Sequence, residues 1–354
     1  MKLSVPYNGF NDFMIGILDK YNHDIQEVYL APSKDISLTG RHRDACTQYK
    51  KCELHVDEYN EKIKEFMTFA SKQSVETNLL FNGSSINFSL YTKEGRRKVM
   101  NYIDRFYSLG ILNGITVTDP YFVDYLCKEI NTNWTGLKLH ASVNMHCDSV
   151  NKLKMLEEMG FYSICIDRDI NRDIEKLKIM KHNSNLNFKL MVNEGCILSC
   201  IYRKYHHELR EVCTSDDDVH ANIRGVINIK YNEHINSDNL PSCLKIYREN
   251  YAEIFRSPFI RPEDLDYYSG IADVIKIAGR EMDCERLEKI IKAYITKQFD
   301  GNLWELIFRF SKNINIYIDN KSIPHDYFHR LSNCKNDCHE CSYCNDLTNL
   351  VESC

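Results

Sequence analysis

The chain has 354 residues, 43% of them hydrophobic, and a formal net charge of −5 at pH 7. This length can bury a core large enough for one barrel-sized domain or for two smaller domains. The acidic balance excludes an overall cationic field, so bulk charge predicts no nonspecific attraction to nucleic-acid phosphates.

The N-terminal stretch, MKLSVPYNGFNDFMIGILDK, carries Asn, Asp and Gly within its apolar run and has no small-residue cleavage site. We therefore expect no signal peptide. No stretch reaches the roughly 18 consecutive apolar residues that cross a bilayer. We expect a cytoplasmic protein without a membrane span, in which cysteines stay reduced and are available as metal ligands.

Short apolar runs recur along the chain, separated by amphipathic helical patterns such as GRRKVMNYIDRFYSLG and CDSVNKLKMLEEMG. Their continuous Val, Ile and Leu content is typical of strands covered on both faces, and hence of a parallel sheet. The alternation predicts a (β/α)8 TIM-type barrel, with an open doubly wound sheet as the alternative. The runs are KLSVPY at 2–7, EVYLAP at 27–32, TNLLFN at 77–82, GITVTDP at 114–120, LKLHASV at 137–143, SICIDRD at 163–169, FKLMVNE at 188–194 and VIKIAGRE at 274–281.

The alternation breaks twice. Residues 201–255 are rich in Tyr, His, Asn and charge, including SDDD at 215–218, which predicts an insertion after the seventh strand. After about residue 301, GNLWELIFRF and NINIYIDN lead into a cysteine-rich tail. We therefore assign residues 1–300 to the barrel with its insertion, and residues 301–354 to a C-terminal extension.

Polar residues close the apolar runs. In a barrel of this type the C-terminal ends of the strands converge on one face, so these residues are site candidates. Each taken singly also fits a turn former or a helix cap. They are Tyr7, Asn8, Asn82, Asp119, His140, Ser142, Asn144, Asp167, Arg168, Asn193, Glu194, Lys276 and Arg280.

The chain contains 15 cysteines, an odd number that argues against a disulfide framework. Cys196 and Cys200 directly follow the seventh predicted strand, so we expect their thiolates at the site face. Cys213 and Cys243, in the insertion, are able to fold back and complete four ligands. Four thiolates suit zinc or an iron–sulfur cluster, and buried structural cysteines are the alternative.

The tail holds the densest cysteine pattern in the chain. Cys334, Cys338, Cys341 and Cys344 are separated by three, two and two residues. Packing alone does not explain four cysteines so close together in a reduced protein, so we predict a metal site with zinc or a second cluster. The four cysteines either form a closed site of their own or lend a ligand to the site predicted at Cys196 and Cys200.

The segment RKYHHEL at 203–209 follows Cys200. If a helix begins there, Arg203, His206 and His207 lie one to two turns beyond that cysteine. They would then bind an anionic substrate or tune a cluster, or they would form an ordinary polar helix face.

The segment SPFIRPEDL at 257–265 places Arg261 after a predicted short strand, with Pro262 opening a helix. Arg261 is then either a bidentate anion anchor or a surface ion pair.

The order of several segments resembles the collagenase-like peptidase U32 family. In that family a strand ending in Asp, a strand with His and Ser followed by Asn, a strand ending in Arg beside an acid, and a cysteine-bearing strand follow one another. The similar segments here are VYLAP, ITVTDPYFVDYL, LKLHASVNMHCDSVNKLKMLEEMGFYSICIDRDINRDIEKLK, FKLMVNEGC, SPFIRPEDL and VIKIAGREM, within residues 2–300.

The resemblance implies a TIM-type barrel. It also implies a [4Fe–4S] cluster on four cysteines, as in family members that are similar to oxygen-independent hydroxylases of ubiquinone precursors or RNA bases. Cys196 matches the cysteine that ends the seventh strand and Cys200 the next ligand. Cys243 resembles the last ligand, and Cys213 is the remaining one.

The closing Lys-Ile-x-Gly-Arg motif of the family matches Lys276, Gly279 and Arg280. We therefore expect an iron–sulfur oxidoreductase that hydroxylates or otherwise modifies an RNA base, a quinone-like ring or a peptide. His140, Asp167, Arg168 and Arg280 would orient this organic substrate.

Two other readings stay open. A metal-assisted peptidase would use zinc on the same cysteines or on the tail, but a four-cysteine zinc site is usually closed and leaves no position for water. A protein without enzyme activity would act as a maturation or scaffold partner whose tail docks another subunit.

Overall fold

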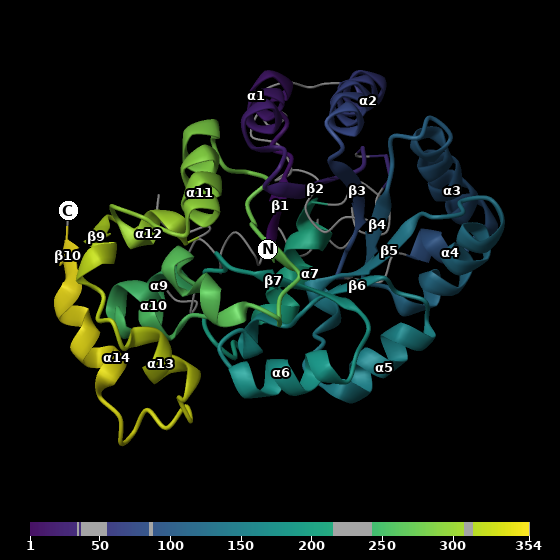
Figure 1. Cartoon of the computed structure of the whole chain (residues 1–354). Coiled ribbons are helices and arrows are strands. Elements are labelled where there is room, and N and C mark those ends of the chain that lie inside the picture. Colours follow the sequence, from purple (N-terminus) through teal and green to yellow (C-terminus); the bar gives the residue numbers. More distant parts are fainter. Residues whose placement is uncertain (34, 37–54, 85–87, 215–242, 308–313, 354) are drawn as a thin grey trace.

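The computed structural model describes residues 1–33, 35–36, 55–84, 88–214, 243–307 and 314–353, and its centre is a closed barrel of parallel strands (Figure 1). The predicted barrel is confirmed, and the open-sheet alternative is wrong. Each predicted apolar run overlaps one strand: β1 (Lys2–Pro6), β2 (Ile25–Leu30), β3 (Glu76–Phe81), β4 (Gly114–Val117), β5 (Lys138–Ala141), β6 (Ser163–Cys165), β7 (Asn187–Met191) and β8 (Val274–Lys276).

The strands pair in chain order, and β8 returns to β1. Ile275 lies opposite both Leu190 of β7 and Leu3 of β1, and all three side chains are buried. Strands enclosed by helices outside and packed side chains inside need apolar residues on both faces, which explains the continuous apolar runs.

Helices surround the barrel (Figure 1). Several begin at a side-chain cap: Asp119 accepts hydrogen bonds from the backbone of Tyr121 and Phe122, with Pro120 in the first turn, as helix N-termini favour. The helices between and after the strands are α1 (Asn11–Tyr21), α2 (Val56–Lys72), η1 (Phe88–Tyr91), α3 (Lys93–Tyr107), α4 (Pro120–Thr132), η2 (Val143–Met145), α5 (Val150–Glu158), η3 (Arg168–Ile170), α6 (Ile174–His182) and α11 (Cys284–Thr296), where η marks a 3₁₀ helix.

The connection from β7 to β8 contains α7 (Arg203–Thr214), α9 (Cys243–Glu249), α10 (Ala252–Arg256) and η4 (Pro262–Tyr268). The SDDD segment of the predicted insertion lies outside the described residues. The short strand predicted before Arg261 is wrong. Ile260 makes one backbone hydrogen bond to Val192 at the end of β7. Pro258 and Pro262 on either side lack the N–H that a ladder requires, so no strand extends.

The C-terminal extension packs beside α9 and α10 (Figure 1). Arg256 at the end of α10 donates a hydrogen bond to Asn345 at 3.2 Å. Trp304 is buried with its ring centroid 5.8 Å from that of Tyr247. The elements are α12 (Leu303–Leu306), β9 (Ile316–Ile318), η5 (Asn320–Ser322), α13 (Tyr327–Ser332), α14 (Tyr343–Asp346), η6 (Leu347–Leu350) and β10 (Val351–Ser353), with β9 and β10 antiparallel.

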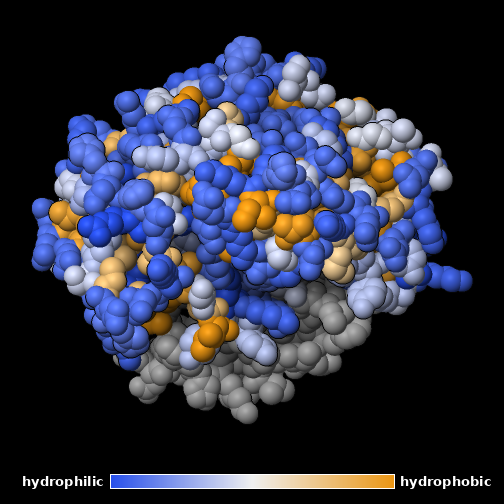
Figure 2. Space-filling view, turned by 60° about the horizontal axis from the view of Figure 1, so that its bottom comes forward, coloured by the Kyte–Doolittle hydropathy of each residue, from blue (hydrophilic) through white to orange (hydrophobic). Residues whose placement is uncertain are grey.

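The face seen in Figure 2 is mostly hydrophilic, with hydrophobic residues in small scattered groups. Within the described ranges, none of the helices combines the length and the apolar character needed to cross a bilayer.

Candidate functional site

Arg168 and Glu194 form a buried ion pair at the C-terminal ends of β6 and β7. Nη1 of Arg168 lies 2.7 Å from Oε2 of Glu194, and both side chains are almost fully enclosed. The two strands are neighbours in the barrel, so residues just past their ends meet. Such a pair in a low-dielectric setting requires good geometry, because both charges have lost their water.

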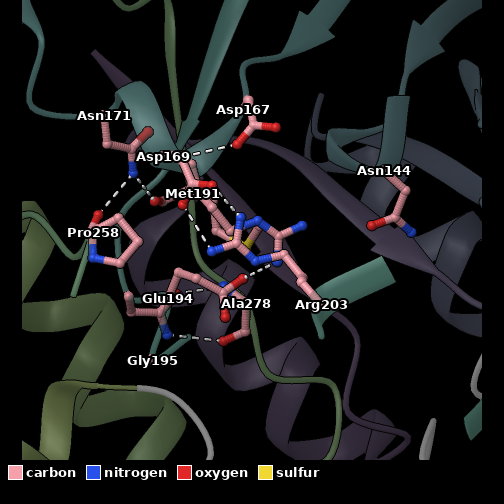
Figure 3. Close-up of polar contacts among 12 residues, drawn as sticks. Asn144, Asp167, Asp169, Asn171, Met191, Glu194, Gly195, Arg203, Pro258 and Ala278 are labelled. Atoms are coloured by element: carbon pink, nitrogen blue, oxygen red, sulfur yellow. Dashed lines mark hydrogen bonds and ion pairs between the residues drawn. The ribbon is translucent and has the colours of Figure 1, made fainter. Parts of the chain in front are cut away.

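A second ion pair holds the loop that bears the two predicted ligands. Arg203, at the start of α7, donates to both carboxylate oxygens of Asp169 at 2.6 and 2.7 Å and to the carbonyl of Ile197 at 2.7 Å. The backbone N–H of Ser199 also donates to Asp169. Asp169 therefore ties the loop between Cys196 and Cys200 to the end of β6, as Figure 3 shows for its pair with Arg203.

Cys196 is buried and Cys200 is half-buried. Burial raises the pKa of the Cys196 thiol, and Glu194 raises it further, whereas Arg168 and Arg203 lower it. The free thiol is therefore neutral, and a metal would have to displace its proton. The side chains of Cys213 and Cys243 lie outside the described residues. In the part of the chain that is described, no three His, Cys, Asp or Glu side chains are gathered as a metal site.

Helix α9 returns to the cysteine loop. The hydroxyl of Tyr247, which is buried, donates to the carbonyl of Gly195 at 3.0 Å. Cys243 is the first residue of the same helix, so it lies about one turn before Tyr247. Tyr247 was not among the residues predicted from the sequence; its one signal there is an aromatic residue four positions after Cys243.

Three arginines at the strand ends keep uncommitted donors. Four guanidinium nitrogens are enclosed and have no hydrogen-bond partner among the described residues. They are Nε and Nη2 of Arg168, Nε of Arg203 and Nη1 of Arg280. Leaving a buried donor without an acceptor is costly, so such groups normally face a water, an ion or a ligand. Their positive charge favours an anionic acceptor.

Asp167 and His146 form another contact at this end of the barrel. Nδ1 of His146 lies 2.8 Å from Oδ2 of Asp167. Burial acts to raise the pKa of Asp167, but the hydrogen bonds from His146 and from the Asp169 backbone outweigh it and hold that pKa below its ordinary value. Asp167 is therefore an anion at neutral pH. His146, which has a left-handed backbone (φ 50°), was not predicted from the sequence.

Other predicted residues hold the barrel rim together. Asn193 is fully buried and exchanges two hydrogen bonds with the backbone of Ala278, which joins the ends of β7 and β8. Asn144 donates to the carbonyl of Asn82 at 3.1 Å. Asp119 caps α4 and accepts from Tyr91. These contacts are structural, and a substrate-binding role for these residues stays a prediction.

His140 lies inside the barrel. Its Nδ1 is 2.6 Å from the hydroxyl of Ser163, and the ring is buried. Burial holds the pKa of His140 well below its ordinary value, and the nearby Lys189 acts in the same direction. Lys189 pairs with Glu27 at 2.6 Å, also in the interior. His140 is thus a neutral member of a buried polar layer, and the structure gives it no contact with the cysteine loop.

Lys276 lies on β8 with its ammonium 4.3 Å from the ring centroid of Tyr29. Burial lowers the pKa of Lys276. Arg261 forms a bidentate pair with Asp264, with both contacts at 2.9 Å. That pair is buried, so of the two predicted alternatives the ion pair is present but not at the surface.

His206 lies in the predicted helix α7, half-buried, with its ring centroid 6.2 Å from that of His207. The predicted tail ligands Cys334, Cys338 and Cys341 are exposed, and Cys344 is half-buried.

Known proteins resemble this chain. A profile described as peptidase family U32 matches residues 47–210. A protein of Methanocaldococcus jannaschii named "Uncharacterized protease MJ1657" is 29% identical over 296 residues, which is 81% of this chain and 80% of that protein.

Two solved structures are also similar. One, described as the U32 peptidase Mk0906, is 14% identical and covers 79% of this chain and 93% of its own, with a TM-score of 0.49. A mutant tryptophan synthase α-subunit from Pyrococcus furiosus is 14% identical and covers 63% and 94%, with a TM-score of 0.35.

Proposed function

We propose that this chain, which resembles peptidase family U32 over residues 47–210, is an iron–sulfur-dependent enzyme that hydroxylates or similarly modifies an organic substrate without molecular oxygen. The observation that carries the proposal is buried Cys196, which lies beside Arg168 and Arg203, whose guanidinium groups keep uncommitted donors. The substrate classes expected are an RNA base, a quinone-like ring or a peptide.

The cysteines of the chain supply the sulfur donors that such a group needs. Cys196, Cys200, Cys243 and Cys213 would hold it: the first two follow β7, and α9, which begins at Cys243, is tied to the cysteine loop by Tyr247. A cluster with four thiolates carries net negative charge and accepts hydrogen bonds at sulfur, which matches enclosed arginine donors. When bound, a [4Fe–4S] cluster would supply one-electron chemistry.

The chain's own residues would prepare the site. Glu194 and Asp169 fix the planes of Arg168 and Arg203, so their free N–H groups keep one direction. Both arginines are buried, which strengthens their electrostatic effect on a neighbouring anion. Asp167, which is ionised, and Arg280 would orient the substrate at the same end of the barrel.

Hydroxylation by a water-derived oxygen breaks a substrate C–H bond and forms a C–O bond, and it releases two electrons and two protons. The reaction therefore needs an external electron acceptor, for which a one-electron redox protein is the suitable class.

The test is anaerobic purification followed by iron, sulfide and zinc quantitation and a visible absorption spectrum. We expect about four irons per chain with matching sulfide, lost in Cys196→Ala and in Cys200→Ala. Cys127→Ala is the matched control, because Cys127 is half-buried on α4 and its thiol donates a hydrogen bond to the Met159 carbonyl, away from the cysteine loop. Zinc alone, unchanged in all three variants, would overturn the proposal.

A peptidase is the second candidate, and the name of the Methanocaldococcus relative, an uncharacterized protease, favours it. A hydroxylase and a peptidase release different products. Incubation with RNA, quinone precursors and a peptide library, followed by mass spectrometry, would reveal added oxygen for a hydroxylase and cleaved peptides for a peptidase.

A further inference from the structure

Three of the tail cysteines line one cavity with the barrel's cysteine loop. The cavity has a volume of about 570 Å³, and its walls include Cys334, Cys338 and Cys344. Leu198 and Ser199, which lie between Cys196 and Cys200, form another part of its wall. The proposed function of the barrel makes no use of the tail cysteines.

In the tail loop, the sulfur of Cys334 accepts a hydrogen bond. The backbone N–H of Asn336 donates to Sγ of Cys334 at 3.3 Å. Asn336 has a left-handed backbone, with φ at 60°, a conformation that Asn tolerates better than most residues. Backbone N–H groups aimed at sulfur stabilise a thiolate, and such outer contacts are a regular part of metal sites.

Three of the tail cysteines share their cavity with a positive charge. Arg256 lines the cavity together with Cys334, Cys338 and Cys344, and its Nε is enclosed without a partner among the described residues. Four thiolates around a divalent ion leave two negative charges, which a neighbouring guanidinium offsets.

Both ends of the loop are anchored, and the described tail does not gather three of its thiols as a metal site, so metal binding would require the middle of the loop to rearrange. Residues 333–342 form no helix or strand. Before them, Tyr327 of α13 is buried and donates to the carbonyl of Phe255; after them, Asn345 of α14 bonds to Arg256. The exposed side chains of Cys338 and Cys341 can therefore turn toward Cys344 without disturbing the core.

We propose that Cys334, Cys338, Cys341 and Cys344 bind a thiophilic metal centre of their own, separate from the barrel site. Either a zinc ion or an iron–sulfur cluster satisfies four thiolates, and the experiment below distinguishes the two. Binding would order residues 333–342 and stiffen the wall of the cavity that faces the Cys196 loop.

The experiment uses the full chain, anaerobic and reduced, in the Cys196→Ala/Cys200→Ala background so that the barrel cysteines contribute no metal. The tail variant adds Cys338→Ser and Cys341→Ser, both at exposed positions. The matched control adds Cys127→Ser. Metal, iron and sulfide are measured as isolated; then the chelator-treated protein is titrated with Zn²⁺ and followed by native mass spectrometry and hydrogen exchange.

We expect about one metal centre per chain in the control and none in the tail variant. In the control, Zn²⁺ should slow hydrogen exchange in residues 333–342 at least tenfold. Zinc in the isolated control would identify an ion, and iron with sulfide a cluster; both support the proposal. Equal metal content in the two variants, or no metal and no change in exchange, would overturn it. Loss of barrel iron in Cys196→Ala alone bears only on the proposed function.

Discussion

Tyr247 donates a hydrogen bond to the carbonyl of Gly195, which lies 52 residues earlier in the chain. This bond joins α9, which begins at Cys243, to the loop that carries Cys196. The bond therefore holds the helix that carries Cys243, an expected ligand, beside the loop of Cys196.

Replacing Tyr247 with Phe should therefore loosen the site. We expect a loss of about 1 kcal/mol in the free energy of unfolding, together with a lower iron content after anaerobic purification. Tyr294→Phe is the control, because its buried hydroxyl makes the same kind of bond to the Ile260 carbonyl, at 2.7 Å. Equal iron content in the two variants would contradict the link between α9 and the cluster.

The buried Arg168–Glu194 pair should be sensitive to loss of one partner. Glu194→Gln leaves the Arg168 charge enclosed without its counter-ion, so we expect the metal-free protein to lose about 3–5 kcal/mol of unfolding free energy. Urea unfolding measures this loss of unfolding free energy. Glu175→Gln, which breaks the exposed pair with Lys178, should leave stability nearly unchanged. Similar small effects in both variants would argue against a buried pair.

Stability should fall as the pH drops below the ordinary histidine pKa of 6.5, because buried His140 has a folded-state pKa well below that value. The unfolded chain then binds a proton that the folded chain does not, so acid favours unfolding by up to about 1.4 kcal/mol per pH unit. Glu27, whose pKa is also lowered, adds a loss only below its ordinary value of 4.5.

Urea unfolding at several pH values between 5 and about 7.5 measures this slope. The slope should become shallower in His140→Gln, which keeps a polar partner for Ser163. Substitution of the exposed His182 is the control. An unchanged slope in His140→Gln would mean that His140 is protonated in the folded state.

Gly114 at the start of β4 should be intolerant of a side chain, because an added Cβ would collide with the His140 ring. We expect Gly114→Ala to cost about 1–3 kcal/mol. Gly16→Ala in α1, where nothing lies within 4 Å of the added carbon, should be neutral or slightly stabilising. Combining Gly114→Ala with His140→Ala should cost less than the sum of the two. Strict additivity would show that the ring is not what excludes the side chain.

The sequence by itself determined the eight strands, since each is a run of apolar residues buried on both faces and the pattern is local. It also identified the ends of β6 and β7, because Asp167, Arg168 and Glu194 are polar residues directly after such runs. Cys196 and Cys200 were recognisable for the same reason: their distance from the end of β7 is a property of the chain alone.

Only the tertiary structure decided which of these residues meet. Arg168 pairs with Glu194 and Asn193 with Ala278, because parallel pairing makes β6, β7 and β8 neighbours although these residues are far apart in the chain. His140 ends a similar polar pattern but points into the barrel interior, since a one-residue step along a strand reverses the side-chain direction. Local pattern determines where strands begin and end, and long-range packing determines the partners of their side chains.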